Sequence, residues 1–517
     1  MILNEIFASQ QIGFPILSTL IGLPLVAALA IRFVTDTASI KVIALAAALA
    51  ELVLALWLLV SFIPGNADIQ FAERRLWIDT IGASYHLGVD GISVLFIPLT
   101  ALVTLLVMLV GGSTPKFFSK TYLGSVLVFE AVVIGIFSSL DLILFYLFYE
   151  LALVPIYLLI KLWGTGTQRQ YTALKYIMYM LVGSASLLVG IVLLGISHPQ
   201  AVAGAGYSFD MLTLAATPPP AQIQSVIFVL LLVGFAVKGP LLPFHTWMPS
   251  ALTQGPVGVG IFLVGLKLGT YAMLRVLLPL APTSSQEWGP VIVCIGLATL
   301  LYGALIALVQ QNLRRLLAFA SISHVGLVLV GLFALNAQSV QGSLLLMLNM
   351  ALASAGLFFM AGALFARLGS SELSAYGGLA RQVPRLAFFF FVFGMASIGL
   401  PGTSGFHGEF LTLLGAFNAH WAFAAVGVLG VVLSAGYFLW FYERAFFGPV
   451  RTVAVTKMKD LSWRETALAS VFAAIIIAVG VFPAPLLNVT EASVNAVVRN
   501  AHSQDEQAKA ARVAVNK

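Results

Sequence analysis

Seven ionisable residues lie within long runs of apolar sequence, and their chemistry is the first feature that needs an explanation. An ionised side chain at the centre of a bilayer costs at least about 2.5–3.5 kcal/mol, so repeated placement of such groups indicates a chemical task. Acids and bases alternate along the chain on separate predicted helices, as a relay for protons or small cations requires. The alternative is that they only hold helices together. The seven are Glu130, Glu150, Lys238, Lys267, His324, His407 and Glu409.

The composition places most of the chain in a membrane. Hydrophobic residues make up 60% of the sequence, charged residues 9%, and the mean hydropathy is +1.02, whereas soluble domains contain roughly 25% charged residues. Apolar stretches of about 18–25 residues, each able to cross the ~30 Å hydrocarbon layer as a helix, follow one another. We predict about fourteen helices, the first retained and not removed as a signal, near residues 15–34, 41–63, 90–111, 122–138, 140–160, 173–195, 224–244, 254–279, 289–309, 316–335, 341–366, 386–414, 420–446 and 465–483.

The sequence argues against several classes of function. Cys294 is the only cysteine, so the chain supplies neither a disulfide framework nor a four-thiolate iron–sulfur cluster. It has no phosphate-binding Gly-rich loop and no dinucleotide motif, and no His or acidic residues with metal-coordinating spacing. The net charge of +6 fits a lipid-facing inner surface without a nucleic-acid partner. We therefore expect no cofactor and no metal in this chain, and an energy source elsewhere.

Basic residues indicate the orientation of the chain. Lys and Arg are concentrated in alternate loops, which the positive-inside rule places on the inner side. The opposite side carries only Arg74 and Arg75 between helices, plus four basic residues in the tail. Both termini are therefore predicted to face outward. The outer loop at 64–87 is long enough for a small lid, and the tail after Pro485 is predicted to be a surface helix or a disordered end.

Two predicted helices contain sequences that break a helix. Residues 235–245 include Pro240 and Pro243, and residues 398–408 are rich in glycine around Pro401. Because proline lacks an N–H group and clashes with the carbonyl group four residues earlier, each helix must kink or break there. Interrupted helices at corresponding places in two halves build sites near the bilayer midplane in inverted-repeat transporters.

The buried ionisable residues suit different steps of a proton relay. Glu150 has no basic residue within one helical turn, so its partner must come from another helix. Lys238 is the natural candidate, and at a separation of about 8 Å the two charges would couple by roughly 2 kcal/mol; a static salt bridge is the alternative. A desolvated lysine such as Lys267 releases its proton readily. His324 can exchange protons in the working pH range, and Glu409 would be the exit or entry acid.

Four further residues are secondary candidates. Glu130 and Asp141 could link the relay to a partner subunit, although Asp141 also suits a helix N-cap. His245 and His407 mark the two helix breaks. They are candidates for gating or for inner-side proton entry, and local capping is an equal alternative for both.

Four sequence segments resemble a known family. They are FYLFYELALVPIYLLIKLWG at 145–164, KYIMYMLVG at 175–183, KGPLLPFHTWMPS at 238–250 and GLPGTSGFHGE at 399–409. These segments resemble the antiporter-like membrane subunits of respiratory complex I, over about residues 85–450. The resemblance implies that Glu150 and Lys238 are the family's Glu–Lys pair, Lys267 its central lysine and His324 its central-axis histidine. Glu409 matches the subunit type that has Glu where sister subunits have Lys.

The resemblance also implies a fold and a domain organisation. The expected fold is an all-α polytopic membrane protein of about fourteen transmembrane helices, with two inverted five-helix repeats and two broken helices. The expected parts are the N-terminal helices with the outer loop (1–111), the first repeat with the break near 238–245 (112–281), the second repeat with the break near 398–408 (289–447), and an inner loop, last helix and outer polar tail (448–517).

The implied function is proton translocation within NADH:quinone oxidoreductase. Electron transfer from NADH to quinone in other subunits would drive protons along the buried Glu, Lys and His residues of this chain. FMN, iron–sulfur clusters and quinone are expected in partner subunits, which include two sister antiporter-like subunits, within a bacterial inner membrane and its lipids. Alternatives are a subunit of a multi-subunit Na⁺/H⁺ antiporter or of a membrane-bound hydrogenase, and a non-transporting scaffold.

Overall fold

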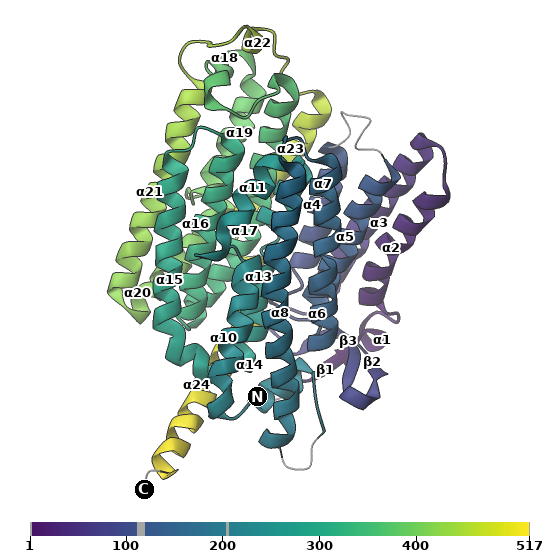
Figure 1. Cartoon of the computed structure of the whole chain (residues 1–517), viewed down its shortest axis with the longest axis vertical. Helices are drawn as coiled ribbons and strands as arrows, with labels where there is room; N and C mark the ends of the chain where they lie inside the picture. The colour runs from purple at the N-terminus through teal and green to yellow at the C-terminus, as the bar shows by residue number, and fades with distance from the viewer. Residues whose placement is uncertain (1–2, 111–118, 203–205, 516–517) are drawn as a thin grey trace.

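Long helices that run along one common direction make up most of the molecule (Figure 1). The computed structural model describes residues 3–110, 119–202 and 206–515. Within this part, eleven helical segments are long and apolar enough to cross a membrane: Ile16–Phe33, Thr37–Ser61, Lys120–Ser138, Leu142–Trp163, Arg169–Ala201, Val257–Leu280, Pro282–Leu308, Leu313–Phe333, Ala337–Leu368, Trp421–Phe446 and Trp463–Val481. Shorter apolar helices span Phe96–Val110, Gln222–Lys238 and Pro384–Ser397. The prediction of a multi-pass, mainly helical membrane protein is confirmed, and the count of about fourteen crossings stays a prediction.

The first half of the bundle contains the segments expected from hydropathy. Its helices are α2 (Ile16–Phe33), α3 (Thr37–Ser61), α4 (Phe96–Val110), α5 (Lys120–Ser138), α6 (Leu142–Leu151), α7 (Leu153–Trp163), α8 (Arg169–Ala201), α9 (Met211–Ala216), α10 (Ala221–Lys238), α11 (Trp247–Gln254), α12 (Val257–Gly265), α13 (Leu268–Ala272) and α14 (Leu278–Leu280). Short turns of 3-10 helix span Phe244–Thr246 (η4) and Asp79–Ile81 (η1). The predicted boundary between 1–111 and 112–281 lies outside the described residues.

The second half is built from longer helices. They are α15 (Pro282–Leu308), α16 (Leu313–Phe333), α17 (Ala337–Leu368), α19 (Pro384–Ser397), α20 (Ser404–Ala419), α21 (Trp421–Phe446), α23 (Trp463–Val481) and α24 (Ala484–Val515), with short segments η6 (Leu373–Ala375), α18 (Leu379–Gln382) and α22 (Val453–Thr456). The apolar windows of α16 and α17 are completely buried. These two helices therefore form the centre of the bundle.

Local sequence explains where several helices begin. At the N-terminus of each of these helices, a short polar side chain accepts a hydrogen bond from a backbone N–H group. This bond satisfies a donor that has no partner within the helix. Asp36, Ser119, Asn312, Asn336 and Ser462 act in this way for α3, α5, α16, α17 and α23.

Both predicted helix breaks are present. The helix α10 ends at Lys238, directly before Gly239-Pro240, and the chain continues through η4 into α11. The helix α19 ends at Ser397, and Gly399 and Gly402 adopt positive φ angles of 67° and 88° before α20 starts at Ser404. Glycine takes up this left-handed conformation without the cost that other residues pay.

A third break was not predicted. The segment expected as one helix over 254–279 is interrupted at Lys267, whose φ angle is +23°, and a π-helical segment, η5 (Met273–Leu277), follows. A positive φ at a residue with a side chain is uncommon and costly. The helix propensities of Leu266 and Lys267 give no sign of such a conformation. The expectation of only two broken helices was therefore wrong.

The all-α expectation also needs a correction. Strands β1 (Glu5–Phe7), β2 (Ile69–Ile78) and β3 (Ala83–Val89) form a sheet in the order β1-β2-β3, with β2 parallel to β1 and antiparallel to β3. The predicted outer loop at 64–87 is thus mainly a hairpin, which turns at Gly82 with a φ of 71°. The strand β2 was missed because its first four residues are buried and its later residues are mostly exposed, so it lacks the alternation of polar and apolar residues by which a strand with one exposed face is recognised.

The sheet and both ends of the described chain lie at the same end of the bundle (Figure 1). We call this the sheet end. The tail helix α24 packs against α15 and α17, and Ser493 accepts a hydrogen bond from the buried N–H group of Gly91 over 2.9 Å. The first part of the tail therefore belongs to the folded core, and the prediction of a surface helix or disordered end was wrong there.

A buried ion pair joins two segments at the sheet end. Arg275 of η5 lies 2.5 Å from Asp90, which directly follows β3. Asp90 also accepts hydrogen bonds from the N–H groups of Ile92 and Ser93. Removing one partner of a buried ion pair typically costs about 3–5 kcal/mol, because it leaves a buried charge uncompensated.

We therefore expect Arg275→Leu to lower the thermal stability of the purified complex sharply. The double variant Asp90→Asn/Arg275→Leu should recover part of the loss, because it removes the unpaired carboxylate. Arg499→Leu is the matched control, since Arg499 is exposed and donates a hydrogen bond to the carbonyl group of Asn495 on its own helix. Thermal unfolding in detergent measures all three, and equal stability of Arg275→Leu and Arg499→Leu would contradict the assignment.

Candidate functional site

The first helix break brings Lys238 to the helix that carries Glu150. The Lys238 Nζ atom donates a hydrogen bond to the carbonyl group of Tyr149 and lies 3.4 Å from the centre of the Tyr149 ring. Tyr149 is in the last turn of α6, where carbonyl groups lack partners from a following turn. Lys238 is therefore held by a carbonyl dipole and an aromatic face, a cation–π contact worth up to about 2 kcal/mol when desolvated.

Glu150 and Lys238 do not form the static salt bridge that was the alternative for this pair. Glu150 is partly exposed and belongs to no ion pair among the described residues. Its charge still acts on Lys238, because Tyr149, which binds Lys238, is its neighbour in the chain. Lys238 therefore binds the residue next to Glu150, and sequence spacing cannot reveal that contact.

Lys267 lies next to the first break and contacts the central helix. Its Nζ atom is 2.6 Å from the Ser321 hydroxyl oxygen of α16. The third break allows this approach, because Gly269 at the start of α13 packs directly against Gly239 of the first break, where a Cβ atom would not fit. Lys238 and Lys267 line the same cavity of about 30 Å³. A water molecule needs about 10–15 Å³ of such space, so the cavity has room for a bridge between the two ammonium groups.

His324 extends this line towards the second break. It is buried and follows Ser321 by three residues on α16, so both side chains lie on one face of the helix. Lys267 acts on it electrostatically, and its ring lies near the carbonyl groups of Ala320 and Ser397, although neither ring nitrogen reaches hydrogen-bonding geometry. Ser397 is the last residue of α19. The second break therefore borders His324 as the first borders Lys238.

Glu409 lies against the second break. It is buried in the second turn of α20, and its carboxyl group occupies the space where a side chain on Gly399 would be. Tyr437 of α21 is close enough to interact with it electrostatically. Neither Glu409 Oε1 nor the Tyr437 hydroxyl group has a hydrogen-bond partner among the described residues.

The four secondary candidates occupy different environments. Asp141 is the N-cap of α6, where it accepts bonds from the N–H groups of Ile143 and Leu144. His245 lies 3.2 Å from the Tyr302 hydroxyl group, and His407 lines a cavity of about 20 Å³ together with Asn349. Glu130 is fully buried, and neither carboxyl oxygen has a partner among the described residues.

Sequence reasoning missed one buried acid next to Glu130. Glu51 of α3 is 0% exposed, its oxygens also lack partners among the described residues, and it interacts electrostatically with Glu130. The signal was available, since Glu51 is the one charged residue in the interior of the apolar segment 42–63. Asp90 and Arg275 were likewise visible as charges at the borders of apolar segments, but not as a pair.

Together, the helix breaks and the buried acids and bases define a class of protein. A multi-pass bundle in which Lys, His and Glu side chains line up beside interrupted helices has the architecture of a membrane subunit that moves ions. The line runs from Glu150 past Lys238 and Lys267 to His324 and Glu409.

Comparisons with known proteins identify the family. The family model described as NADH:quinone oxidoreductase/Mrp antiporter, TM, matches residues 139–434. NADH-quinone oxidoreductase subunit M of Rickettsia typhi is 36% identical over 496 residues, which cover 94% of this chain and 99% of that protein. NADH-ubiquinone oxidoreductase chain 4 of Arabidopsis thaliana is 33% identical and covers 94% of this chain and 97% of that one.

A solved structure agrees with the sequence relatives. A chain of respiratory complex I from Thermus thermophilus with bound NADH superimposes with a TM-score of 0.85 at 30% identity, over 94% of this chain and 99% of that chain. The chain belongs to the NADH:quinone oxidoreductase/Mrp antiporter transmembrane family, with subunit M and chain 4 as its relatives. The resemblance noted in the sequence is confirmed.

The contact between Gly399 and Glu409 allows a sharp test of the second break. Gly399→Ala should displace the Glu409 carboxyl group and reduce proton transport, because the new methyl group occupies its position. Gly402→Ala is the matched control, since Gly402 also has a positive φ but nothing within 4 Å of its Cβ position. Both variants place a Cβ atom at a residue with a positive φ angle, which costs roughly 1–2 kcal/mol. Equal transport by the two, measured in vesicles that contain the complex, would contradict this placement of Glu409.

Proposed function

We propose that this chain is a proton-translocating membrane subunit of a NADH:quinone oxidoreductase. The observation that carries the proposal is the arrangement of half-buried Lys238 and buried Lys267, His324 and Glu409 beside two helix breaks, in a chain whose relatives are complex I subunits. A proton-transfer path needs groups of both charge types at short intervals within the apolar layer. Glu150 at one end and Glu409 at the other supply the acids.

The path begins at the Glu150–Tyr149–Lys238 arrangement. Lys238 is stabilised by the Tyr149 carbonyl group and ring, and the negative charge of Glu150 adds to this. When Glu150 gains a proton, Lys238 loses that attraction and releases its own proton more easily. Moving one charge through 100 mV costs about 2.3 kcal/mol, which is comparable to roughly 2 kcal/mol for two charges about 8 Å apart. Gain or loss of the attraction between Glu150 and Lys238 is therefore large enough to move a proton against the membrane potential.

The later steps use the central helix. Lys267 passes its proton by way of the Ser321 hydroxyl group, which can donate and accept, towards His324. His324 borders the second break, and Glu409 receives the proton beyond it. The secondary relay or gating residues are Glu130, Asp141, His245 and His407. His245 and His407 mark the two breaks and are the gating candidates, and Asp141 is also the N-cap of α6.

The proposal includes a fold and an orientation. The eleven long apolar helices and three shorter ones together cross the membrane fourteen times, and two inverted five-helix repeats span 112–281 and 289–447, each with one Pro- and Gly-containing break. The sheet end, where both chain ends lie, is on the outer side of a bacterial inner membrane, because basic residues are concentrated in the loops at the other end.

The proposed assembly supplies what this chain lacks. FMN, iron–sulfur clusters and quinone belong to partner subunits, where NADH oxidation releases the energy, and two sister antiporter-like subunits flank or extend the same membrane arm. No redox centre is assigned to this chain, so its part in the enzyme is that of a translocase.

Substitution of the two ends of the first step tests the proposal. Glu150→Gln and Lys238→Met should abolish proton transport coupled to NADH oxidation in membrane vesicles, because each removes a group that must change its charge. Glu443→Gln and Lys161→Gln are matched controls on exposed residues of α21 and α7, and they should transport protons normally. Full coupled transport by both Glu150→Gln and Lys238→Met would refute the proposed function.

A Na⁺/H⁺ antiporter, a hydrogenase subunit and a passive scaffold give different results. Purification of the complex from native membranes with NADH-oxidising subunits attached supports complex I, and their absence supports one of the other two assemblies. A scaffold predicts that the neutral variants keep full activity as long as the complex assembles.

A further inference from the structure

A groove on the outside of the bundle runs between α2, α5 and α7. Its volume is about 410 Å³, which lies within the range of about 300–1,000 Å³ typical of ligand sites in proteins. Apolar side chains form most of its wall, and Leu29 of α2 and Val154 of α7 are exposed within it. Leu25, Val128 and Leu158 belong to the same wall. We call this site the lateral groove.

Two basic side chains, Arg32 and Lys120, line one end of the lateral groove. Arg32 is in the last turn of α2, and Lys120 is the first residue of α5. The Lys120 Nζ atom donates a hydrogen bond to the carbonyl oxygen of Arg32 over 3.2 Å, so the two cationic residues lie side by side. Leu25 and Val128 lie about two helical turns further along α2 and α5, or roughly 11 Å away. The groove therefore has a basic end and an apolar part.

The basic end lies at the level of a membrane surface. The helix α2 has 18 residues and is about 27 Å long, close to the ~30 Å thickness of the hydrocarbon layer. Its first turn is held at the sheet end, where Glu73 of β2 accepts the N–H groups of Leu17 and Ser18. Arg32 therefore lies at the opposite boundary of the apolar layer (Figure 1), where lipid headgroups are found.

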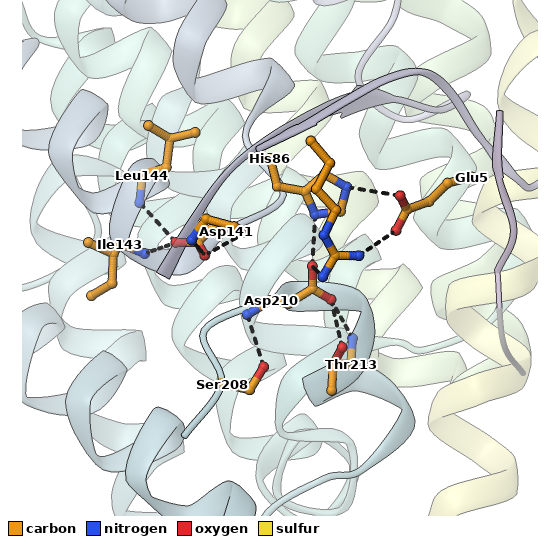
Figure 2. A network of polar contacts seen from close by, with 10 residues as sticks. Glu5, His86, Asp141, Ile143, Leu144, Ser208, Asp210 and Thr213 are labelled. Atoms are coloured by element: carbon orange, nitrogen blue, oxygen red, sulfur yellow. Dashed lines mark hydrogen bonds and ion pairs between the residues drawn. The ribbon is translucent and has the colours of Figure 1, made fainter. Parts of the chain in front are cut away.

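The positive charge of the groove has no counter-charge within the described part of the chain. Arg32 and Lys120 belong to no ion pair among the described residues, and the side chain of Asp36, the next acid after Arg32, caps α3. The sheet end differs, because bases and acids pair there. His86 lies 2.7 Å from Asp210, for example (Figure 2). The basic end of the groove is thus suited to an anion from outside the chain.

We propose that the lateral groove binds a phospholipid with a negatively charged headgroup. Its phosphate group lies between Arg32 and Lys120, which bind phosphate oxygens by charge-assisted hydrogen bonds, and an acyl chain follows the apolar wall towards Leu25 and Val128. Basic pockets between transmembrane helices are suited to such headgroups. A free anion would use the basic end alone, whereas a lipid fits both parts of the groove. The inference does not depend on the proton relay.

A glycine gives the groove its depth. Among the described residues outside its own helix, a Cβ atom on Gly124 would meet only Ile31 Cδ1, at 3.8 Å, and Gly124 lines the groove. A larger side chain at this position therefore enters the groove and does not collide with another helix. Gly436 of α21 has matching surroundings, because its Cβ atom would meet only Leu308 Cδ1, also at 3.8 Å. The two glycines allow filling of the groove to be separated from loss of a helix glycine.

The test is photolabelling of the complete complex in phosphatidylcholine vesicles. One preparation contains a small fraction of phosphatidylglycerol with a diazirine group in its acyl chain, and the other contains phosphatidylcholine with the same label. Labelled residues are mapped by mass spectrometry after illumination. In the native protein, residues 121–128 and 154–158 should be labelled more strongly by phosphatidylglycerol, because its net negative charge is attracted by the two basic residues.

Substitution of the basic residues should remove this preference. Arg32→Gln and Lys120→Gln should each lower the ratio of phosphatidylglycerol to phosphatidylcholine labelling roughly fivefold, which corresponds to about 1 kcal/mol for each basic residue near the surface. The double variant should label equally with both lipids, and Arg32→Lys, which keeps the charge, should retain most of the preference. Arg444→Gln is the matched control, because Arg444 is also exposed in the last turn of its helix, α21.

Filling the groove gives a second, independent measurement. Gly124→Leu should reduce labelling of residues 154–158 by both lipids, whereas Gly436→Leu should label as the native protein does. If Gly124→Leu prevents assembly of the complex, the substitutions of exposed Arg32 and half-buried Lys120 decide the question.

Four results would each overturn the inference. They are equal labelling of the native groove by both lipids, a native preference in the Arg32→Gln/Lys120→Gln variant, loss of the preference in millimolar inorganic phosphate at constant ionic strength, and crosslinks from the groove to a partner subunit in place of lipid. The third result would assign the basic end to a free anion, and the fourth would assign the groove to a protein contact. None of these results bears on proton transport, so failure of the lipid site and failure of the relay are distinguishable.

Discussion

The cost of an unpaired polar group in an apolar interior is the constraint on which this structure depends. In a helix bundle within lipid, backbone groups must bond within their helices and charged side chains must find partners or water. A broken helix leaves some backbone groups without partners within the helix, and these groups can then bind charged side chains. Carbonyl groups near helix ends become available to side chains, as the Tyr149 carbonyl group is to Lys238. The helix breaks therefore supply hydrogen-bond partners that charged side chains in the bundle need.

The same constraint explains why the central helices carry the chemistry. The helices α16 and α17 are enclosed on all sides, so Ser321 and His324 meet only protein groups and small cavities. In such surroundings the interaction between Lys267 and a neutral partner such as Ser321 is strong, because water does not compete with it. The carboxyl oxygens of Glu51 and Glu130, and Oε1 of Glu409, have no hydrogen-bond partner among the described residues, and a buried polar group without a partner is costly.

The sheet end fixes the positions of helix ends at the boundary between membrane and water. Strands and short helices at the water boundary hold the first turns of α6 and α9 by backbone hydrogen bonds. Ion pairs there join residues that are far apart in sequence, Glu5, His86 and Asp210. The structure gives the N-terminal strand a place in the same frame as Glu150.

The sequence by itself determined the helical membrane fold, both proline-containing breaks and the placement of five ionisable residues in apolar segments, Glu150, Lys238, Lys267, His324 and Glu409. These features could be predicted from the sequence because hydropathy, proline stereochemistry and the cost of buried charge act locally along the chain. The tertiary structure decided that Lys238 binds Tyr149, that the helix breaks again at Lys267, that Glu51 interacts with Glu130, and that β1, β2 and β3 form a sheet. Each of these depends on which segments approach in space, and residue type and spacing along one chain do not encode that approach in a readable pattern.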